Sequence, residues 1–507
     1  MNWIRSFNRD FDALVSLCGA RPALVAAGDE ERKLSYAELD AVIDRTLAWL
    51  RAHGVNQGDT VGAVLPNSME MLSIFLACMR GGLGFAPLAC DTTQNEVRRW
   101  AELIKPKLIC FSPVLNADVA TTLKSTGLPG ADVVSNGKFA HLPMQSENQP
   151  HYEGGRLYLF SSGTTGAPKA IVLDVDRLWS AGHAFVRLHG AEFDKPFRIW
   201  NYLPQSYLGG LFNLALIPFT IGGTVVIDDV FSGKTFLGFW QTVQRYDINV
   251  LWLVPSIVRG LITLGERTRR NEVLHDAPKI DLAFLGTAPI EVETKRKFER
   301  LFGFRLLENF ALSETTFLTS EMRGDNDIRG EGSTGRKLPY AELAFRPVAE
   351  ESDRYNEILV RSPFLMLGYL GDNGEWTTPD DDGFFPTGDL GYLDEHGQLV
   401  LTGRSKDVIK KGGYFIALRE IELLAQTNAQ VIEAAAVATP HQFYGESYRL
   451  LIRLKSDAPA DAAQSVTDFV FAALAKHKWP DSVEAVDEFP RTASGKIRKF
   501  LLSKGAE

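Results

Sequence analysis

Along the chain up to about Gly335, short apolar runs alternate with stretches in which apolar residues recur at helical spacing. The runs typical of buried strands cover residues 61–65, 108–111, 157–160, 171–173, 225–227, 250–254, 282–285 and 305–307. Apolar residues at helical spacing, with start signals such as Ser35 and Glu38, predict helices over residues 35–54, 67–79, 236–246 and 291–302 and from residues 176 and 256. Because strands alternate with helices, this part of the chain predicts parallel sheets covered by helices on both faces.

The pattern changes near Gly335, where alternating runs over residues 341–345 and 357–360 meet turns rich in Gly and Asp. Such runs predict a smaller antiparallel β module. After Arg404 a basic, glycine-interrupted segment leads into a compact tail with strands at 431–437 and 449–454 and a helix at 461–477. We place the domain boundary between Gly403 and Lys406.

One uncharged stretch, residues 207–227, is about as long as a membrane-spanning helix. Gly209-Gly210, Pro218 and Gly222-Gly223 divide it into a helix-sized piece and a short strand over residues 225–227. The sequence therefore favours a buried helix, turn and strand, and we expect a protein that is not integral to a membrane.

Composition narrows the class of protein. Of the 507 residues, 45% are hydrophobic and 23% are charged, as in ordinary globular enzymes. The net charge of −9 disfavours a nucleic-acid-binding surface, although local loops can still bind an anionic nucleotide. The cysteines have neither metal-binding spacing nor disulfide density, and the N-terminus shows no signal-peptide pattern. We therefore expect a reducing, cytoplasmic environment.

A loop rich in glycine and hydroxyl side chains joins two of the predicted strands. It reads Ser161-Ser162-Gly163-Thr164-Thr165-Gly166-Ala167-Pro168-Lys169. Glycine lets successive backbone amides face one concavity that can hold phosphate oxygens, and the hydroxyls and Lys169 add donors and charge. The spacing is not that of a Walker loop, because Ala170 follows the lysine. A flexible Gly/Ser/Thr connector is the alternative, which the buried flanking strands and the terminal lysine disfavour.

Later stretches also combine glycine turns with polar or charged side chains. They are Gly286-Thr287-Ala288-Pro289, Asn309-Phe310-Ala311-Leu312-Ser313-Glu314, Pro386-Thr387-Gly388-Asp389-Leu390-Gly391, Gly403-Arg404-Ser405-Lys406-Asp407 and Pro490-Arg491-Thr492-Ala493-Ser494-Gly495-Lys496. Each has an ordinary alternative when taken alone: a tight strand-to-helix connection, a solvated carboxylate, an Asp in a glycine turn, a solvated charge cluster and a surface lysine.

Taken in this order, the stretches resemble the motifs of the acyl-adenylate-forming superfamily: acyl-CoA synthetases, peptide-synthetase adenylation domains and beetle luciferases. The resemblance spans most of the chain and is closest to the acyl-CoA synthetases. It implies an α/β fold with a large N-terminal AMP-binding domain, residues 1–403, made of two helix-covered parallel-type sheets and a small β-barrel module. A small, mobile α+β lid domain, residues 404–507, is expected to follow, with its hinge near Lys406.

The resemblance also implies a role for each motif. The phosphates of ATP would bind the loop, at Ser161, Ser162, Gly163, Thr164, Thr165, Gly166 and Lys169. The nucleotide would also bind Gly286, Thr287, Ala288, Asn309, Phe310, Ala311, Ser313, Asp389 and Arg404, with Ser313 near the phosphates and Arg404 at the ribose and phosphate region. Phe310 offers a face for base stacking and Asp389 two acceptors for the ribose hydroxyls. Glu314 and Thr165 would hold Mg²⁺, and Lys496 is the expected catalytic lysine.

A carboxylate that attacks the α-phosphate brings two anions together, so the site must concentrate positive charge on the phosphates. Lys496, Mg²⁺ and the loop amides are suited to this task. The expected products are an acyl-adenylate and pyrophosphate, followed by a thioester with CoA after the lid domain rotates.

The resemblance implies that the acid binds at the stretch Leu203-Pro204-Gln205-Ser206-Tyr207-Leu208-Gly209-Gly210, together with Leu312. We assign Tyr207, Leu208, Gly209 and Leu312 to a mostly apolar pocket, although they can also be ordinary core residues. Tyr207 stands where the family commonly has histidine, and Ala311 replaces a usual glycine, which disfavours very bulky acids. No aspartate lies between Leu203 and Phe219 to hold an α-ammonium group, which favours an acid without one.

Several activities stay open at this stage. A ligase of an aliphatic or aromatic acid with CoA is the first hypothesis. A ligase that loads a separate phosphopantetheine carrier protein and an amino-acid-activating enzyme are the alternatives. A non-catalytic nucleotide-binding relative is disfavoured because Lys169, Glu314, Asp389, Arg404 and Lys496 are all present. Oxygenation of the luciferase kind is the least favoured.

Overall fold

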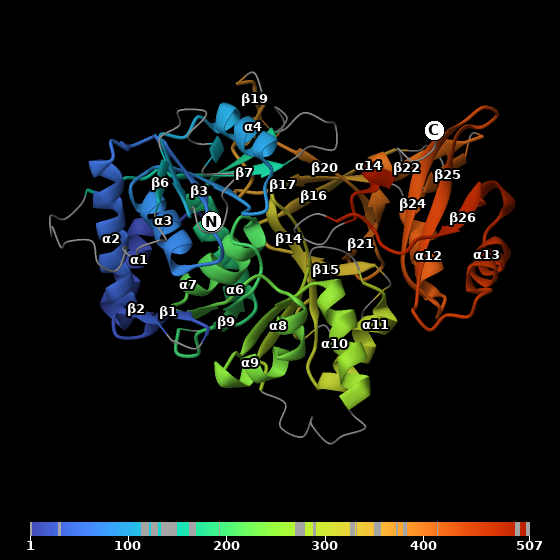
Figure 1. The fold of residues 1–507 in the computed structure, drawn as a ribbon, viewed down its shortest axis with the longest axis horizontal. Helices are drawn as coiled ribbons and strands as arrows, with labels where there is room; N and C mark the ends of the chain where they lie inside the picture. Colours follow the sequence, from blue (N-terminus) through green and yellow to red (C-terminus); the bar gives the residue numbers. More distant parts are fainter. Residues whose placement is uncertain are drawn as a thin grey trace.

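The computed structural model describes residues 3–28, 32–112, 121–122, 130–132, 150–161, 169–191, 193–268, 279–286, 290–324, 330, 332–348, 356–371, 374–378, 383–412, 414–491 and 497–502. A large body of two sheets with surrounding helices carries a smaller C-terminal lobe, coloured orange to red in Figure 1. The lobe lies beside the antiparallel strands of the body.

The first sheet carries the glycine- and hydroxyl-rich loop at the end of one strand. Its strands run in the order β19 (Trp376–Thr377), β18 (Gly368–Leu370), β8 (Lys169–Asp174), β7 (Arg156–Ser161), β4 (Gly84–Leu88), β3 (Thr60–Val64), β5 (Leu108–Phe111) and β6 (Gly130–Asp132). The strands from β7 to β6 pair in parallel, whereas β8 and β18 are added antiparallel.

Helices with well-defined caps flank this sheet. They are α1 (Phe7–Cys18), α2 (Tyr36–Ala52), α3 (Met69–Arg80), α4 (Gln94–Ile104) and α6 (Val175–Leu188). Ser35 and Glu38 form the predicted capping box of α2, and Ser68 caps α3 through the N–H of Met71. Helix α3 is buried on all sides, which explains its almost uninterrupted apolar sequence.

The second sheet joins a parallel half to an antiparallel half. Its strand order is β16 (Glu342–Pro347), β17 (Asn356–Arg361), β20 (Phe385–Leu393), β21 (Gln398–Arg404), β15 (Ser333–Lys337), β14 (Thr316–Ser320), β13 (Leu307–Leu312), β12 (Leu282–Leu285), β11 (Val250–Leu253), β9 (Arg198–Asn201), β10 (Thr224–Ile227), β1 (Pro22–Ala26) and β2 (Lys33–Ser35). Its helices include α8 (Gly233–Leu237), α9 (Phe239–Arg245), α10 (Pro255–Thr268) and α11 (Val292–Phe302). Pairing changes from parallel to antiparallel at β13, so β13 is the junction between the halves.

The uncharged stretch folds as predicted, as buried helix followed by a strand. It consists of a π-helix, η2 (Gly209–Leu216), a short α7 (Ile217–Phe219) and β10. Within the described part of the chain, no helix combines the length and apolar character that a membrane span requires.

The C-terminal lobe has its own small core. Its elements are β22 (Val408–Lys411), β23 (Tyr414–Ala417), α12 (Leu418–Thr427), β24 (Val431–His441), β25 (Gly445–Leu454), α13 (Ala462–Ala473), β26 (Ser482–Ala485) and α14 (Lys499–Leu502). The strands form one sheet in the order β23-β22-β25-β24, with β26 on β25, and Ile416, Ile421, Tyr448 and Ile452 are buried between this sheet and its helices.

The predicted α/β architecture is confirmed, with differences in detail. The predicted helix over residues 236–246 is two helices, because Gly238 interrupts it. The strand predicted over residues 305–307 begins at Leu307 and runs to Leu312, so Asn309 to Leu312 of the following motif lie within β13, and Ser313 and Glu314 come directly after it. Among the described strands, the antiparallel module pairs in a line from β15 to β16, so the expected barrel is observed as an open sheet.

Candidate active site

Several predicted site residues lie outside the described residues: Ser162, Gly163, Thr164, Thr165, Gly166, Thr287, Ala288 and Lys496. The ends of their segments are nevertheless defined. Ser161 and Lys169 are cross-strand partners at the ends of β7 and β8, so the two ends of the predicted phosphate loop lie side by side. Gly286 directly follows β12 on one side of the next turn, and Ile290 follows the turn on the other.

Glu314 and Lys169 are brought together by a tyrosine. The Oη of Tyr369 donates to Glu314 Oε1 at 2.8 Å, and Lys169 Nζ lies 5.6 Å from the centroid of the Tyr369 ring. Tyr369 reaches this place because β18 pairs with β8, with Tyr369 opposite Ile171. Burial and the Glu314 carboxylate raise the pKa of Tyr369, so its hydroxyl stays protonated and keeps donating.

This arrangement fits a Mg²⁺ ion bound mainly through phosphate oxygens. Among the described residues, no group of three or more His, Cys, Asp or Glu side chains is placed to hold a metal. Mg²⁺ commonly binds one or two protein oxygens together with substrate phosphates, and Glu314 beside the end of the phosphate loop supplies one such oxygen.

Asn309 and Phe310 stand at the end of the β12–β13 pair. Asn309 Nδ2 donates to the carbonyl of Leu285 at 3.0 Å, and Asn309 Oδ1 lies beside Gly286, where an added Cβ would be 3.2 Å away. Phe310 is buried, Ala311 is exposed and Ser313 is half-buried. A register shift between Phe310 and Ala311 changes the side-chain direction at this point.

Asp389 and Arg404 form a cross-strand ion pair. They are opposite each other on β20 and β21, and Arg404 Nε lies 2.9 Å from Asp389 Oδ1. Asp389 is buried, whereas the Arg404 side chain is 44% exposed. The Asp389 N–H also donates to Thr387 Oγ1 at 3.1 Å, which fixes the backbone at the end of the motif.

The residue predicted as the hinge lies next to this pair. Lys406 occupies the 3₁₀ turn Ser405–Asp407, which joins β21 to β22. Burial and the positive charge of Arg404 lower the pKa of Lys406. Ser405 Oγ donates to the carbonyl of Gly388 at 3.2 Å, so the turn is attached to the Asp389 motif.

Backbone contacts join the two described ends of the segment that carries Lys496. Arg491 and Ile497 form a β-bridge, and the N–H of Arg498 donates to the carbonyl of Pro490 at 2.7 Å. Burial raises the pKa of Tyr207, and the charge of Arg498 opposes this rise.

Asn67 holds the predicted acyl-binding stretch in place. Its Nδ2 donates to the carbonyls of Leu203 and Asp228, at 2.9 and 3.1 Å, and its Oδ1 accepts from the N–H of Gln205 at 2.8 Å. Tyr207 is exposed, and Leu208 and Gly209 are half-buried at the start of the π-helix. Asn201 Nδ2 donates to the carbonyl of Gly210 at 2.9 Å, which satisfies one backbone acceptor there.

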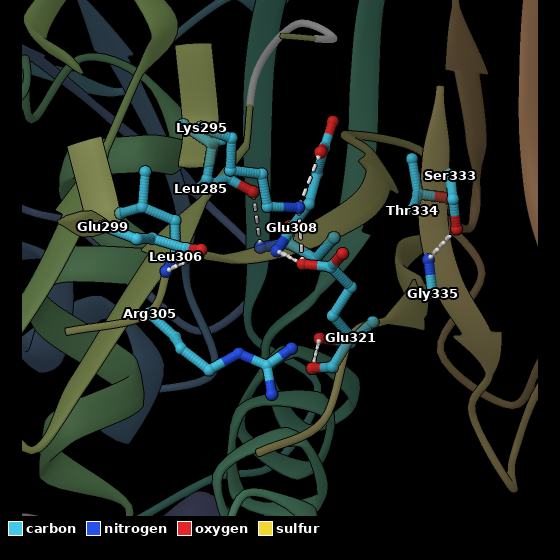
Figure 2. Close-up of polar contacts among 12 residues, drawn as sticks. Leu285, Lys295, Glu299, Arg305, Leu306, Glu308, Glu321, Ser333, Thr334 and Gly335 are labelled. Carbon is cyan, nitrogen blue, oxygen red and sulfur yellow. Dashed lines mark hydrogen bonds and ion pairs between the residues drawn. The ribbon is translucent and has the colours of Figure 1, made fainter. Parts of the chain in front are cut away.

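A buried ion cluster lies behind β13, and Figure 2 shows it. Lys295 Nζ on α11 lies 3.1 Å from Glu308 Oε2 and 2.6 Å from Glu321 Oε2. The Glu308 N–H donates to Glu321 Oε2 at 2.8 Å. Burial raises the pKa of Glu308 to about 7, Lys295 opposes this rise, and Glu321 adds to it.

This shift predicts a pH dependence of stability. Between pH 4.5, the ordinary pKa of the carboxyl, and about 7, folded Glu308 holds a proton that the unfolded chain has released. The free energy of unfolding should therefore fall as the pH rises through this window. Glu308→Gln cannot bind this proton. Over the same pH range its free energy of unfolding should therefore fall less than that of the unsubstituted protein, by about 1–3 kcal/mol. Urea unfolding from about pH 5 to pH 7 measures both slopes, and equal slopes would contradict the assignment.

The sequence predicted neither Tyr369 nor the ion cluster of Lys295, Glu308 and Glu321. Tyr369 lies 55 residues from Glu314, and no local pattern connects the two. The sequence predicts Asn67 only at the start of a helix, although an amide directly before a buried helix is also a candidate for holding a neighbouring loop.

The described residues include a phosphate-type loop end beside Glu314, a buried carboxylate paired with arginine, and the apolar stretch predicted to bind the acid. These are the parts expected of a nucleotide-dependent ligase. The chain belongs to the AMP-binding enzyme family: the model of the AMP-binding enzyme matches residues 12–370, and that of its C-terminal domain matches residues 420–496. This confirms the predicted family, the fold class and the type of enzyme, a ligase of the AMP-forming type.

Relatives match the chain over nearly its whole length. An indoleacetate–CoA ligase of Aromatoleum aromaticum is 29% identical over 95% of both chains, and a sulfoacetate–CoA ligase of Cupriavidus necator is 28% identical over 97% of both. Among solved structures, ATP-bound MatB from Rhodopseudomonas palustris superposes with a TM-score of 0.84, with 26% identity and 99% of each chain covered. The amide bond synthetase McbA from Marinactinospora thermotolerans, 24% identical with a TM-score of 0.82 over 97% of this chain and 98% of its own, shares the fold.

Proposed function

We propose that this protein activates a carboxylic acid with ATP and then transfers the acyl group to the thiol of CoA. The carboxylate oxygen attacks the α-phosphorus, the bond to the bridging oxygen of the β-phosphate breaks, and pyrophosphate leaves. The thiol then loses its proton, its sulfur attacks the acyl carbon, and AMP leaves with the electrons of the broken bond. The CoA ligases among the full-length relatives support this reaction.

The observations that support the proposal are two contacts between predicted motif residues and partners far from them in the sequence or across a sheet. Tyr369 connects Glu314 to the end of the phosphate loop at Lys169, and Asp389 pairs with Arg404 at the root of the C-terminal lobe. The two described ends of the loop that carries Lys496 are joined by the Arg491–Ile497 bridge. We infer that the nucleotide, the acid and Lys496 meet in one site.

Within this site we assign roles to the chain's own residues. The loop from Ser161 to Lys169 binds the phosphates, Phe310 stacks on the adenine, and Asp389 accepts the ribose hydroxyls. Lys496 stabilises the charge that develops as the acid attacks. Mg²⁺, when held through Glu314 and Thr165, neutralises phosphate charge. Holding the two reactants together supplies much of the remaining rate.

We further propose that residues 1–403 form the AMP-binding domain and that residues 404–507 move as a lid about Lys406. Lys406 lies in a single 3₁₀ turn between the body and the lobe, and such short connecting segments commonly absorb the rotation of a hinge. Rotation would withdraw Lys496 after the first step and admit the thiol for the second.

The acid should lack an α-ammonium group. The segment from the acyl-binding stretch through the π-helix contains no aspartate, and most of its side chains are apolar. Burying an ammonium without a partner costs several kcal/mol. We therefore expect pyrophosphate release with amino acids to be at least about 100-fold slower than with the desamino acids of the same side chain. A pyrophosphate-release screen over aliphatic, aromatic and amino acids measures this ratio, and equal rates would favour the amino-acid-activating alternative.

The acceptor is tested separately from the acid. A purified acyl-adenylate should be consumed with CoA and released as AMP and acyl-CoA. Consumption with a holo-carrier protein but not with CoA would instead identify a carrier-loading ligase. A chain that binds ATP but releases no pyrophosphate with any acid would be the non-catalytic relative.

A further inference from the structure

Two amide side chains, Asn67 and Gln205, connect the first sheet to the second by reciprocal hydrogen bonds. Asn67 Oδ1 accepts from the Gln205 N–H at 2.8 Å, and Gln205 Oε1 accepts from the Ser68 N–H at 2.9 Å. Asn67 Nδ2 also donates to the carbonyls of Leu203 and Asp228, at 2.9 and 3.1 Å. This amide pair therefore joins the start of α3 to the segments that follow β9 and β10.

The amide pair lies at the same edges of the two sheets as the proposed nucleotide-binding segments. Asn67 follows β3, which is parallel to β4 and β7, and the proposed phosphate loop begins at Ser161, where β7 ends. Leu203 and Asp228 follow β9 and β10, which are parallel to β11 and β12, and Gly286 directly follows β12. Ligands of open α/β sheets bind outside the carboxyl ends of the strands, so the pair lies where an acid can meet the nucleotide.

The turn that the amide pair holds is closely packed against the π-helix. The Tyr207 N–H donates to the Pro204 carbonyl at 3.1 Å, and the Leu211 N–H donates to the Tyr207 carbonyl at 3.1 Å. A Cβ added to Gly210 would lie 2.3 Å from the Pro204 carbonyl oxygen, so the start of the helix packs directly on the backbone of the turn. A displacement of the turn would therefore move Tyr207 and the start of the π-helix together.

Packing alone does not explain Gln205. Its side chain is 1% exposed, and its Nε2 group makes no hydrogen bond within the part of the chain that the structure describes. A buried donor without a partner costs stability, so an unbranched apolar side chain such as methionine would fill the same space without this cost. What the amide adds is Oε1, which accepts from the Ser68 N–H and ties the turn to the start of α3.

We propose that Asn67 and Gln205 are positioning residues that fix the turn from Leu203 to Tyr207 and so set which length of acid this enzyme accepts. This inference rests on the proposed function, in which the acyl-binding stretch that contains this turn binds the acid. Neither amide side chain is assigned contact with the acid. Both act through the backbone of the turn, which holds the exposed side chain of Tyr207 in a fixed place at the proposed pocket.

The test uses Asn67→Ala in the full-length protein. The probes are straight-chain acids from acetate to decanoate, dicarboxylates from oxalate to adipate, and aromatic acids from benzoate to phenylpropanoate. The substitution removes the acceptor for the Gln205 N–H and the donor to the carbonyls of Leu203 and Asp228, so the turn loses three of its hydrogen bonds.

The expected effect falls on the acid and not on ATP. The KM for the preferred acid of the panel should rise about 10- to 100-fold, because a reactant held about 1 Å out of place loses effects of this size. The KM for ATP should change less than about threefold, since the substitution removes no group assigned to the nucleotide. The ratio of kcat/KM between the preferred acid and its homologue with one more methylene should fall about fivefold, because a displaced wall discriminates less between chain lengths.

Asn249→Ala is the matched control, because Asn249 holds the opposite end of β9. Its Oδ1 accepts from the Arg198 N–H at 2.7 Å, and its Nδ2 donates to the Pro196 carbonyl at 3.4 Å. Arg198 begins β9, whereas Leu203 follows its end. This variant should lower the melting temperature and leave the KM for the acid and the methylene ratio unchanged. Unchanged values in Asn67→Ala, or equal changes in Asn249→Ala, overturn the proposal.

A second variant keeps the proposal testable if Asn67→Ala does not fold. Gln205→Met keeps an unbranched side chain of similar size and removes only the acceptor for the Ser68 N–H. The KM for the acid should rise about fivefold, in line with the loss of one hydrogen bond, while the KM for ATP stays unchanged. An unchanged KM for the acid in this variant again overturns the proposal.

Tyr207→Ala separates this inference from the proposed function. Truncation of Tyr207 removes one wall of the proposed pocket, so the preferred acid of the panel should become longer or bulkier. An unchanged preference would overturn the inference and leave the ligase reaction standing. Failure of the unsubstituted protein to release pyrophosphate with any acid would instead overturn the proposed function itself.

Discussion

Lys496→Ala is expected to lower acid-dependent pyrophosphate release by about 10²–10³-fold, the usual loss when a group that stabilises developing transition-state charge is removed. Two anions must approach each other in this step, and Lys496 is the tail's proposed source of positive charge at the α-phosphate. The tail around it is held by the Arg491–Ile497 bridge and by the Arg498–Pro490 hydrogen bond, neither of which involves the Lys496 side chain. The loss should therefore fall on the chemistry and leave the melting temperature nearly unchanged.

Two measurements define this result. Thioester formation from a purified acyl-adenylate and CoA should change less than about threefold, because that step no longer involves the pyrophosphate. Lys455→Ala, which removes an exposed lysine of the same lobe, is the control and should leave both rates unchanged. Normal pyrophosphate release by Lys496→Ala would contradict the proposed role.

Glu314→Gln is expected to lower pyrophosphate release by about 100-fold at low Mg²⁺ concentration, with partial recovery as Mg²⁺ is raised. The substitution keeps the shape of the side chain and an oxygen that can still accept from Tyr369 Oη, which lies 2.8 Å from Oε1 of the glutamate. It removes the negative charge that a hard divalent cation prefers. The Mg²⁺ dependence of the rate is therefore the diagnostic measurement.

Tyr369→Phe separates the charge of Glu314 from its orientation. This variant removes one hydrogen bond to a charged group and should cost roughly tenfold in rate, with a Mg²⁺ dependence close to that of the unsubstituted protein. If Glu314→Gln were as active as the unsubstituted protein at every Mg²⁺ concentration, Glu314 would not be a metal ligand.

Much of the architecture could be predicted because local and tertiary preferences agree. The capping box at Ser35 and Glu38 and the Ser68 cap define helix starts through hydrogen bonds within a few residues. The continuous apolar runs of the parallel strands follow from burial on both faces. The continuation of β13 to Leu312 was missed because its second half pairs with β14, and such a partner is not evident from the strand's own residues.

The candidate site could be predicted only at residues that belong to recognisable motifs. Glu314, Asp389 and Arg404 stand in such motifs, and the structure adds the Tyr369 contact of the first and the ion pair of the other two. The position of Tyr369 depends on the antiparallel pairing of β18 with β8. Lys295 forms ion pairs with Glu308 and Glu321, and the three residues come from separate parts of the chain. Single charged residues on an amphipathic helix give no sign that they will be buried, since most such residues are solvated.

The π-helix lies beside the stretch that we propose to bind the acid, so a change in its length would alter the proposed pocket. A π-helix holds more residues per turn than an α-helix, so removal of one residue between Gly209 and Leu216 would let the segment rewind with ordinary spacing. Gly209 would then rotate relative to β9 and β10, the strands before and after this segment. These two strands could keep their register in the sheet. A single deletion in a gene would thus reshape one wall of the proposed acid pocket and leave the proposed ATP-binding residues unchanged.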